Sequence, residues 1–237
     1  MDTSGNSHHI SQQFDVELEN LRTRVFAMGG LVEQQVRDAV MALSEGNTDL
    51  CDQVISNDHK VNALEVEIDE ECTHIIARRQ PAASDLRLII AVIKTITDLE
   101  RIGDQAEKVA RMGRALADME RPRNGYYEIQ ALGEYVQNMV RDSLDAFVRM
   151  DVQAAVAVAK RDLKVDQEYE GIMRQLMTFM MEDPRTIKRI LDVMWAARAL
   201  ERVGDHAKNI CEYVVYLVEG KDVRHTRVEK IAEQFEK

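Results

Sequence analysis

The sequence contains little proline, glycine or aromatic residue. Its 237 residues include 3 Pro and 11 Gly, and aromatic residues make up 5%. Proline and glycine end helices and form turns, so their scarcity predicts few turns and long elements. Few aromatic residues together with 12 Met favour helices over strands. The hydrophobic content of 45% is too high for a disordered chain.

Cysteine is also rare, and the three thiols form no recognisable framework. Cys51, Cys72 and Cys211 are odd in number and lack C-x-x-C spacing. They cannot all pair with one another, which is typical of a reducing compartment where thiols serve as small core residues. The polar N-terminus has no secretory signal. We therefore expect a cytoplasmic protein.

Positive charge and long apolar runs are both deficient. Lys and Arg number 31 against 42 Asp and Glu, which gives a net charge of −11. A general nucleic-acid binder needs the opposite balance, so we expect no nucleic-acid partner. The longest apolar run in the middle of the chain, 88–93, is far shorter than the roughly 20 residues that a membrane span requires. We expect no membrane insertion.

What the chain does contain is a copy of itself. Residues 36–38 (VRD) recur as 140–142, an offset of 104, and the motif at 99–106 recurs at 200–207, an offset of 101. Self-similarity at a fixed spacing indicates a duplicated structural unit. A loss of three residues in a turn of the second copy explains the change in offset.

Each copy has the pattern of three helices. Asn47 and its counterpart Asp151 are good N-caps, and Pro81 and Pro184 suit a first helical turn. The segment 118–126 holds the third proline and an Asn-Gly pair, which favours a linker. The pattern predicts helices over 15–45, 48–79, 82–117, 127–149, 152–182 and 185–219. The predicted parts are a first bundle (1–117), the linker (118–126), a second bundle (127–220) and a polar tail (221–237).

Apolar spacing supports two bundles. In the third helix of each copy, apolar residues step by three and four positions, with Gly103 and Gly204 on the same seam. This spacing is typical of helices that pack at a shallow angle. Glycine destabilises a helix interior, so both glycines predict the close approach of a neighbouring backbone. The sequence thus predicts an all-α fold of two tandem three-helix bundles with six long helices, related by an internal repeat.

Acidic residues at equivalent positions of the two copies are the strongest functional signal. Surface charges should drift between copies, whereas four pairs at i,i+4 spacing persist, which places both members of each pair on one helix face. A bound cation would relieve their mutual repulsion, and oxygen ligands suit Mg²⁺, Mn²⁺ or iron better than zinc. The predicted metal ligands are Glu100 and Asp104, Glu201 and Asp205, Asp58 and Asn62, and Asp162 and Asp166.

Two alternatives to a metal-binding scaffold stay open. In a metal-free helical adaptor, Arg101 and Arg202 would form salt bridges with the repeated acids. If metal binds, Arg101, Arg202 and His206 are predicted to support the ligands from behind, and His206, whose counterpart is Gln105, is also a candidate nitrogen ligand of the second site. In a ferritin-like metalloenzyme, two helices would carry E-x-x-H, but the motif occurs only at 71–74 and is not repeated. No catalytic signature is present, so we expect no enzyme. Glu65 and Asp69 are not repeated and are expected to face solvent.

Three segments closely resemble the PhoU family of phosphate-transport accessory proteins: ARRQPAASDLR (77–87), DLERIGDQAEKV (98–109) and ALERVGDHAKNI (199–210). The resemblance covers nearly the whole chain, including the repeat. It implies metal clusters bound by paired acids on the bundle surfaces. It also implies a cytoplasmic negative regulator of the phosphate-starvation response that modulates high-affinity phosphate uptake.

The resemblance further implies the partners and the placement of the metal ligands. The expected partners are the ATPase subunit of a phosphate ABC transporter and a membrane sensor histidine kinase, and homodimers are common in the family. The family motif falls on the four pairs named above, with Asn62 as the one departure from an acid. Because an amide oxygen is a weaker ligand for a hard cation, the first site is expected to be the weaker one. The acidic surface opposes direct capture of phosphate, so sensing is expected to be indirect.

Overall fold

The computed structural model describes residues 4–122, 126–224 and 226. Their regular elements are helices: α1 (Ser4–Glu45), α2 (Thr48–Arg79), α3 (Ala83–Ala117), α4 (Tyr127–Arg149), α5 (Val152–Lys160), α6 (Asp162–Glu182), the 3₁₀ turn η1 (Pro184–Thr186) and α7 (Ile187–Glu219). The all-α prediction is confirmed. The expected tail lies mostly outside the described residues, as do residues 123–125 of the expected linker.

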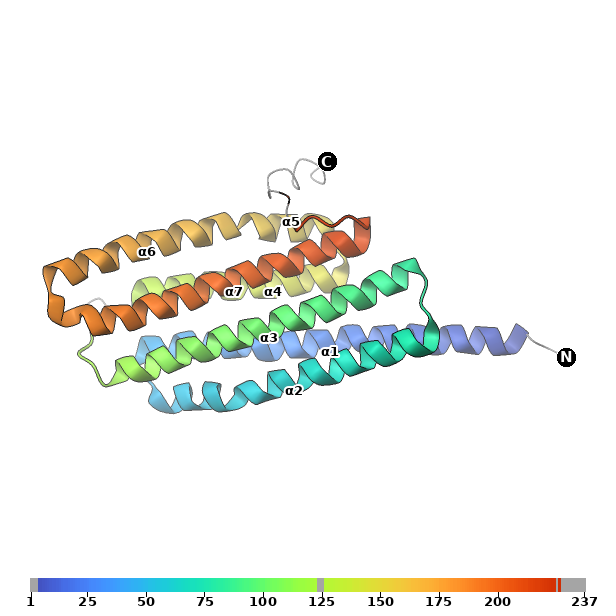
Figure 1. Cartoon of the computed structure of the whole chain (residues 1–237), viewed down its shortest axis with the longest axis horizontal. Helices are drawn as coiled ribbons and strands as arrows, with labels where there is room; N and C mark the ends of the chain where they lie inside the picture. Colours follow the sequence, from blue (N-terminus) through green and yellow to red (C-terminus); the bar gives the residue numbers. More distant parts are fainter. Residues whose placement is uncertain (1–3, 123–125, 225, 227–237) are drawn as a thin grey trace.

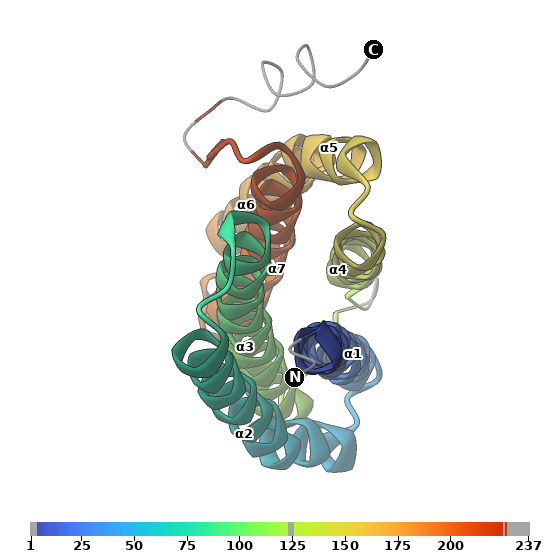
Figure 2. The same cartoon turned by 90° about the vertical axis from the view of Figure 1, so that its right-hand side faces the viewer.

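The helices form two three-helix bundles that lie side by side (Figure 1). One bundle is α1, α2 and α3, and the other is α4, α7 and the α5–α6 rod. The end view in Figure 2 shows α3 beside α7 and α1 beside α4, and these pairs pack against each other. Most buried apolar residues of both bundles form one continuous core, and Val156, Val215 and Val223 form a small separate cluster. The predicted repeat of two three-helix units is thus confirmed, with a shared interior.

The helix ends follow the predicted local chemistry. The side chains of Asn47 and Asp151 accept hydrogen bonds from the backbone N–H groups of Leu50 and Ala154, at 3.0 and 2.9 Å. Each cap satisfies one of the donors that a helix start leaves without a partner. Gly46 follows α1 with a φ of +71°, a left-handed conformation that glycine adopts without strain. The first helix is longer than predicted, because it begins at Ser4 and not at residue 15.

The predicted helix 152–182 is wrong in one respect, because the chain turns at Arg161. The Arg161 N–H donates to Val158 O and the Lys164 N–H donates to Arg161 O, which tightens the backbone locally. The Arg161 guanidinium pairs with Asp142 and lies 5.2 Å from the centroid of the Tyr135 ring. No proline or glycine marks this break, and the counterpart of Arg161 in the unbroken α2 is Asn57. Tertiary side-chain contacts therefore accompany the interruption.

The two seam glycines are tightly packed, but side chains and not a neighbouring backbone approach them. A Cβ at Gly103 would lie 3.5 Å from Val61 Cγ1, and one at Gly204 would lie 3.2 Å from Val165 Cγ1. Val61 and Val165 are repeat counterparts, so each bundle has the same contact. The predicted close packing at Gly103 and Gly204 is therefore confirmed, but the prediction that a backbone approaches them was wrong.

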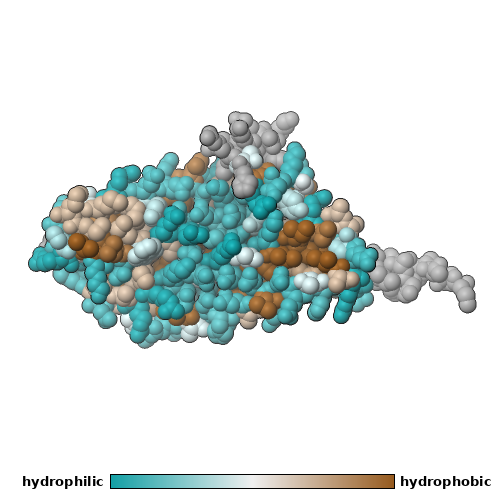
Figure 3. Space-filling view, viewed as in Figure 1, coloured by the Kyte–Doolittle hydropathy of each residue, from teal (hydrophilic) through white to brown (hydrophobic). Residues whose placement is uncertain are grey.

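The surface is mostly hydrophilic, with local apolar patches (Figure 3). One patch lies at the left-hand end of that view, where α6 and α7 meet. These two helices carry several exposed apolar side chains: Met177, Met181, Ile187, Leu191 and Trp195. Trp195 is 64% exposed, so it is not a core residue. Among the described residues, no helix is both long and apolar enough to cross a membrane.

Candidate functional site

The middle of each bundle carries a cluster of acidic side chains between its second and third helices. In the first bundle, α2 contributes Asp58 and Asn62, and α3 contributes Glu100 and Asp104. The four are mostly withdrawn from solvent, with Asp58 only 8% exposed. The Asn62 amide donates to Asp58 Oδ2 at 3.1 Å, so this predicted pair is joined by a hydrogen bond. These residues form what we call the first cluster.

Glu65 belongs to the first cluster, contrary to the expectation that it faces solvent. Its side chain is half-buried, and burial raises its pKa, with Asp69 and Asp104 raising it further. Its counterpart in the second copy is Tyr169. The requirement that an acid recur in both copies therefore excluded Glu65 from the predicted ligands. The packing of α2 against α3 brings the Glu65 carboxylate close enough to raise the pKa of Glu100. Asp69 is exposed, as expected.

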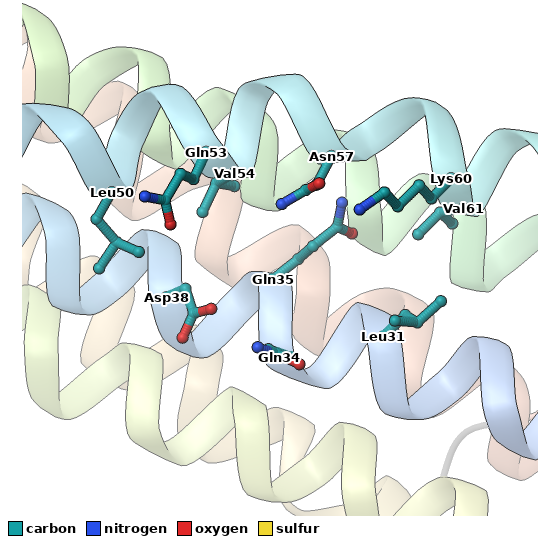
Figure 4. A pocket seen from close by; sticks show the side chains of 10 residues that line it. All are labelled: Leu31, Gln34, Gln35, Asp38, Leu50, Gln53, Val54, Asn57, Lys60 and Val61. Atoms are coloured by element: carbon teal, nitrogen blue, oxygen red, sulfur yellow. The ribbon is translucent and has the colours of Figure 1, made fainter.

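A polar cavity of about 210 Å³ lies between α1 and α2 beside the first cluster (Figure 4). Gln35 extends from α1 between the two helices in that view, and it is only 7% exposed. Its Oε1 has no hydrogen-bond partner, and a Cβ at Gly103 would lie 3.1 Å from this oxygen and 3.4 Å from Asp58 Oδ1. Two buried oxygens without donors thus flank the same glycine. Gln35 was missed because its counterpart is Met139.

The second cluster has acids at all four equivalent positions, with Asp166 in the place of Asn62, and an added cation. Asp162 and Asp166 come from α6, and Glu201 and Asp205 come from α7. Lys208 Nζ donates to Asp162 Oδ2 at 2.6 Å, and Asp162 is 3% exposed.

Arg198 also belongs to the second cluster, where its NH1 donates to Glu201 Oε1 at 2.6 Å. The counterparts of Lys208 and Arg198 in the first bundle are Glu107 and Thr97. The second cluster is therefore partly neutralised by its own helix α7, whereas Glu107 pairs outward with Arg111.

Mutual repulsion and burial disfavour the charged forms of these acids. Burial raises the pKa of Glu100, and the neighbouring Asp104, Glu65 and Asp58 raise it further. In the second cluster, burial likewise raises the pKa of Glu201 and Asp205. Although burial lowers the pKa of Lys208, its hydrogen bond to Asp162 raises that pKa above the ordinary value. A cation placed among the acids would favour their charged forms.

The donor chemistry fits a hard cation, whereas the present arrangement of side chains does not complete a site. Several buried oxygens find no hydrogen-bond partner in the described part of the chain: Asp58 Oδ1, Asn62 Oδ1, Asp162 Oδ1 and Glu201 Oε2. Buried polar atoms normally find partners, so these four mark places where a ligand would be stabilised. Yet no group of three or more His, Cys, Asp or Glu among the described residues is arranged to hold a metal ion. Coordination would require a change of side-chain rotamer.

The two arginines of the repeated motif, Arg101 and Arg202, form no ion pair with the acids of either cluster in the described part of the chain. Arg101 is half-exposed, and its nearest ion-pair partner is Asp98, at 4.0 Å. Arg202 is exposed, and no ion pair links it to a carboxylate in the part of the chain that the structure describes. In the second cluster, the acids Glu201 and Asp162 pair instead with Arg198 and Lys208. The role of Arg101 and Arg202 as salt-bridge partners stays a prediction.

His206 points away from the second cluster into the interface between the bundles. Its Nδ1 lies 2.7 Å from Asp98 Oδ1 on α3, and Tyr213 O–H donates to Asp98 Oδ2 at 2.7 Å. Asn209 Nδ2 donates to Asp98 Oδ1 at 3.1 Å. Asp98 is 1% exposed, so these three groups from α7 satisfy a carboxylate buried in the shared core. The counterparts of Asp98 and Tyr213 differ from them, which hid this network from the sequence.

The comparisons with known proteins match both halves of the chain. A family model described as the PhoU domain matches residues 25–112 and again residues 129–214. The chain is 54% identical over 230 residues to the phosphate-specific transport system accessory protein PhoU homolog of Pseudomonas putida, covering 97% of this chain and 90% of that one. It is 50% identical over 226 residues to the phosphate-specific transport system accessory protein PhoU of Escherichia coli, covering 95% and 93%.

A solved structure has the same fold. The crystal structure of PhoU from Pseudomonas aeruginosa superposes with a TM-score of 0.85 at 53% sequence identity. The match covers 88% of this chain and 100% of that one. The agreement extends over both bundles, including the second copy of the repeat.

Proposed function

The chain belongs to the PhoU family, and we propose that it is an accessory protein of a phosphate uptake system that represses the phosphate-starvation response when phosphate is plentiful. The observation that carries this proposal is that the family's domain matches both repeats. The relatives that the chain matches over nearly their whole length are named as accessory proteins of phosphate-specific transport. The proposed site of action is the cytoplasmic side of the membrane.

The proposed mechanism is that of a scaffold and not of an enzyme. The long helices share one packed core, so the molecule presents its outer faces as rigid surfaces. We propose that one surface contacts the ATPase subunit of a phosphate ABC transporter and another contacts a sensor histidine kinase. The transporter's conformation would then be passed to the kinase, and a homodimer would present each surface twice.

Phosphate sensing is proposed to be indirect. With a net charge of −11, the protein repels phosphate over its surface, and the two acidic clusters are the least suitable places for an anion. Calorimetric titration of the purified protein with inorganic phosphate should therefore give no binding heat at micromolar to millimolar phosphate. Tight, saturable phosphate binding to the isolated protein would overturn this part of the proposal.

The clusters are proposed to hold divalent or transition cations, with Mg²⁺, Mn²⁺ or iron favoured over zinc by the oxygen ligands. Asp58, Asn62, Glu100 and Asp104 would hold one ion, and Asp162, Asp166, Glu201 and Asp205 another. A bound cation would link two helices of one bundle. In the second cluster, Asp162 Oδ1 on α6 and Glu201 Oε2 on α7 are buried without a partner in the described residues, and in the first cluster Asp58 Oδ1 and Asn62 Oδ1 on α2 are. Elemental analysis of the purified protein, before and after dialysis against each metal, tests this directly.

A metal-free adaptor is the second candidate, because Lys208 and Arg198 already supply positive charge to the second cluster. It predicts that no metal is retained and that replacing Glu201 and Asp205 by Ala changes neither metal content nor regulation. A metalloenzyme of ferritin-like type has no such support, since no second E-x-x-H exists.

The regulatory proposal is tested in a bacterium that lacks its own relative of this chain. A reporter driven by a phosphate-starvation promoter should be active in high phosphate without the protein and should be silenced when this chain is expressed. A pull-down from membranes, with and without phosphate, then identifies the partners. A reporter that stays active, with the chain stably expressed at comparable levels, would contradict the proposal.

A further inference from the structure

The second bundle has an open groove at the end where α6 meets α7. Its volume is about 520 Å³, and it is bounded by α4, α6, α7 and residues 120–122. Its apolar floor comes from α6 and α7: Ile172, Leu176, Phe179, Ile190 and Val193. Phe179 is 41% exposed. An aromatic side chain on the wall of a groove of this size provides a ready contact for an apolar partner.

The first bundle shows what normally covers this surface. The two bundles differ at the outer part of the groove: Leu176 is half-buried and Phe179 is 41% exposed, whereas their counterparts Cys72 and Ile75 are 0% and 4% exposed. The deeper floor residues are buried in both bundles: Ile172, Ile190 and Val193, and their counterparts Ile68, Ile89 and Val92. The difference in layout that bears on this end of the bundle is the chain that precedes each repeat unit. The family match begins at residues 25 and 129, and α1 extends for about six turns before the first start point, whereas only the segment 118–128 separates α3 from the second.

The front part of α1 is the cover of the first bundle. Leu21 is completely buried, and Phe14 and Leu18 pack against the same core, so one face of this helix closes the end of α2 and α3. Glu17 of the same segment accepts two hydrogen bonds from Arg79 at the end of α2, at 3.0 and 2.6 Å. An amphipathic helix with acidic groups toward α2 therefore fills the position that is open in the second bundle.

The charges at the open groove are reversed. The counterparts of Arg78 and Arg79 at the end of α6 are Glu182 and Asp183. Glu120 and Glu128 also line the groove, against Arg121 and Arg189 as its two lining cations. Both arginines donate to backbone carbonyls, of Glu45 and Glu120 respectively. Asp183 is ion-paired with Arg185, and the three remaining lining acids still outnumber the two lining arginines. A helix that enters this groove thus meets a net negative rim where the cover of the first bundle meets arginine.

We propose that this groove binds an amphipathic helix of a partner protein, with apolar residues at i, i+4 and i+7 and Lys or Arg beside them. The apolar spacing is that of Phe14, Leu18 and Leu21. The basic flank is required by Glu182 and its neighbours. The front part of α1 from a second copy is disfavoured, because its Asp15, Glu17 and Glu19 would meet the acidic rim. This inference stands on the groove and does not depend on phosphate regulation.

Two labelled peptides test the proposal on the full-length protein. The first has the chain's own sequence over residues 12–27, and the second has the same sequence with Asp15→Lys, Glu17→Lys and Glu19→Lys. By fluorescence anisotropy, the basic peptide should bind with one saturable phase and about tenfold more tightly than the native-sequence peptide. Its advantage should shrink as salt is raised, because screening weakens exposed charge pairs.

Matched variants of α6 locate the binding. Phe179→Arg, in the groove wall, should abolish binding of the basic peptide, whereas Met181→Arg, exposed on the same helix, should leave it unchanged. Glu182→Lys should remove the preference for the basic peptide. Circular dichroism must show that all three variants stay folded.

Failure of the basic peptide to bind, or binding of the basic peptide that Phe179→Arg leaves intact in a folded protein, would overturn the proposal. Tighter binding of the native-sequence peptide would also overturn it and would assign the groove to a second copy. Sedimentation would then show a dimer that Phe179→Arg dissociates. The starvation-promoter reporter reads out the proposed regulatory function separately, so a failure of one leaves the other intact.

Discussion

The two acidic clusters have the same origin and differ in how their charge is balanced. In the second cluster, α7 supplies Lys208 to Asp162 and Arg198 to Glu201. In the first, the same positions are Glu107 and Thr97, and Asp58 has only the Asn62 amide. One copy therefore carries an internal cation, and the other leaves its acids to repel one another. An external cation has more to gain at the first cluster.

This difference favours the opposite of an expectation drawn from the ligands alone, which stays a prediction. Asn62 in place of an acid suggests that the first cluster is the weaker cation site. The structure adds Glu65 to the first cluster and Lys208 to the second, and both additions act in the opposite direction. An estimate of cation affinity that uses only the types of ligand leaves out the charged side chains that neighbouring helices place beside the ligands.

The largest expected effect comes from removing the internal cation. Lys208→Met should lower the free energy of unfolding by about 2 kcal/mol, because Asp162 is left charged and buried without a partner. Urea denaturation followed by circular dichroism measures it. Lys188→Met, an exposed site on the same helix, is the control and should change stability by less than about 0.5 kcal/mol. Equal effects of the two variants would mean that Lys208 has no special role.

Cation affinity should separate the clusters next. Under the metal-binding proposal, Mn²⁺ should bind the first cluster about tenfold more tightly than the second, about 1.4 kcal/mol, because no ammonium competes there. Calorimetry should show the tighter phase lost in the double variant Glu100→Gln, Asp104→Asn and kept in Glu201→Gln, Asp205→Asn. If the tighter phase is lost instead in Glu201→Gln, Asp205→Asn, the second cluster is the stronger site, as the types of ligand alone predict.

The two counterpart aspartates should respond to the same substitution with opposite signs. Asp162→Asn weakens a charge-assisted hydrogen bond to Lys208 and should destabilise the metal-free protein by about 1 kcal/mol. Asp58→Asn removes a buried charge that Glu107 and Asp104 repel, and should stabilise it by about 0.5 kcal/mol. Thermal unfolding in the presence of a chelator compares them. Destabilisation of similar size in both variants would show that the clusters are equivalent.

A further expected effect is on the pH dependence of stability. Burial raises the pKa of Asp58 above 3.8 in the folded protein, so the folded state binds more protons than the unfolded state from about pH 4 upward. Stability therefore falls as pH rises through this window. Burial raises the pKa of Glu212 to about 7, which extends the loss toward neutral pH. Asp58→Asn should flatten the acidic part of the curve and leave the part due to Glu212.

Urea midpoints measured at several pH values in chelator provide the check, with Glu212→Gln as the matched variant for the neutral region. A wild-type curve that rises between pH 4 and 7 would contradict the assigned direction of both shifts. A curve that Asp58→Asn leaves unchanged would remove Asp58 from the explanation.

Much of the fold was predictable because it depends on local patterns. The apolar seam, the caps at Asn47 and Asp151 and the duplicated motif each lie within one or two helical turns, and their spacing determines helix faces directly. The paired acids of the clusters were found in the same way. The break at Arg161 was not, because it carries no proline or glycine and coincides with contacts to Asp142 and Tyr135 from another helix.

The sequence by itself determined the helices, their duplication and the eight repeated side chains, since periodicity and self-similarity act along the chain. Tertiary structure alone decided which charges meet. It brought Glu65 and Gln35 to the first cluster and Lys208 to the second, turned His206 toward Asp98, and left the groove beside Phe179 open. The physical reason is that contacts between helices depend on their rotation and on what precedes each repeat. Two nearly equal copies thereby acquired different electrostatics and different surfaces.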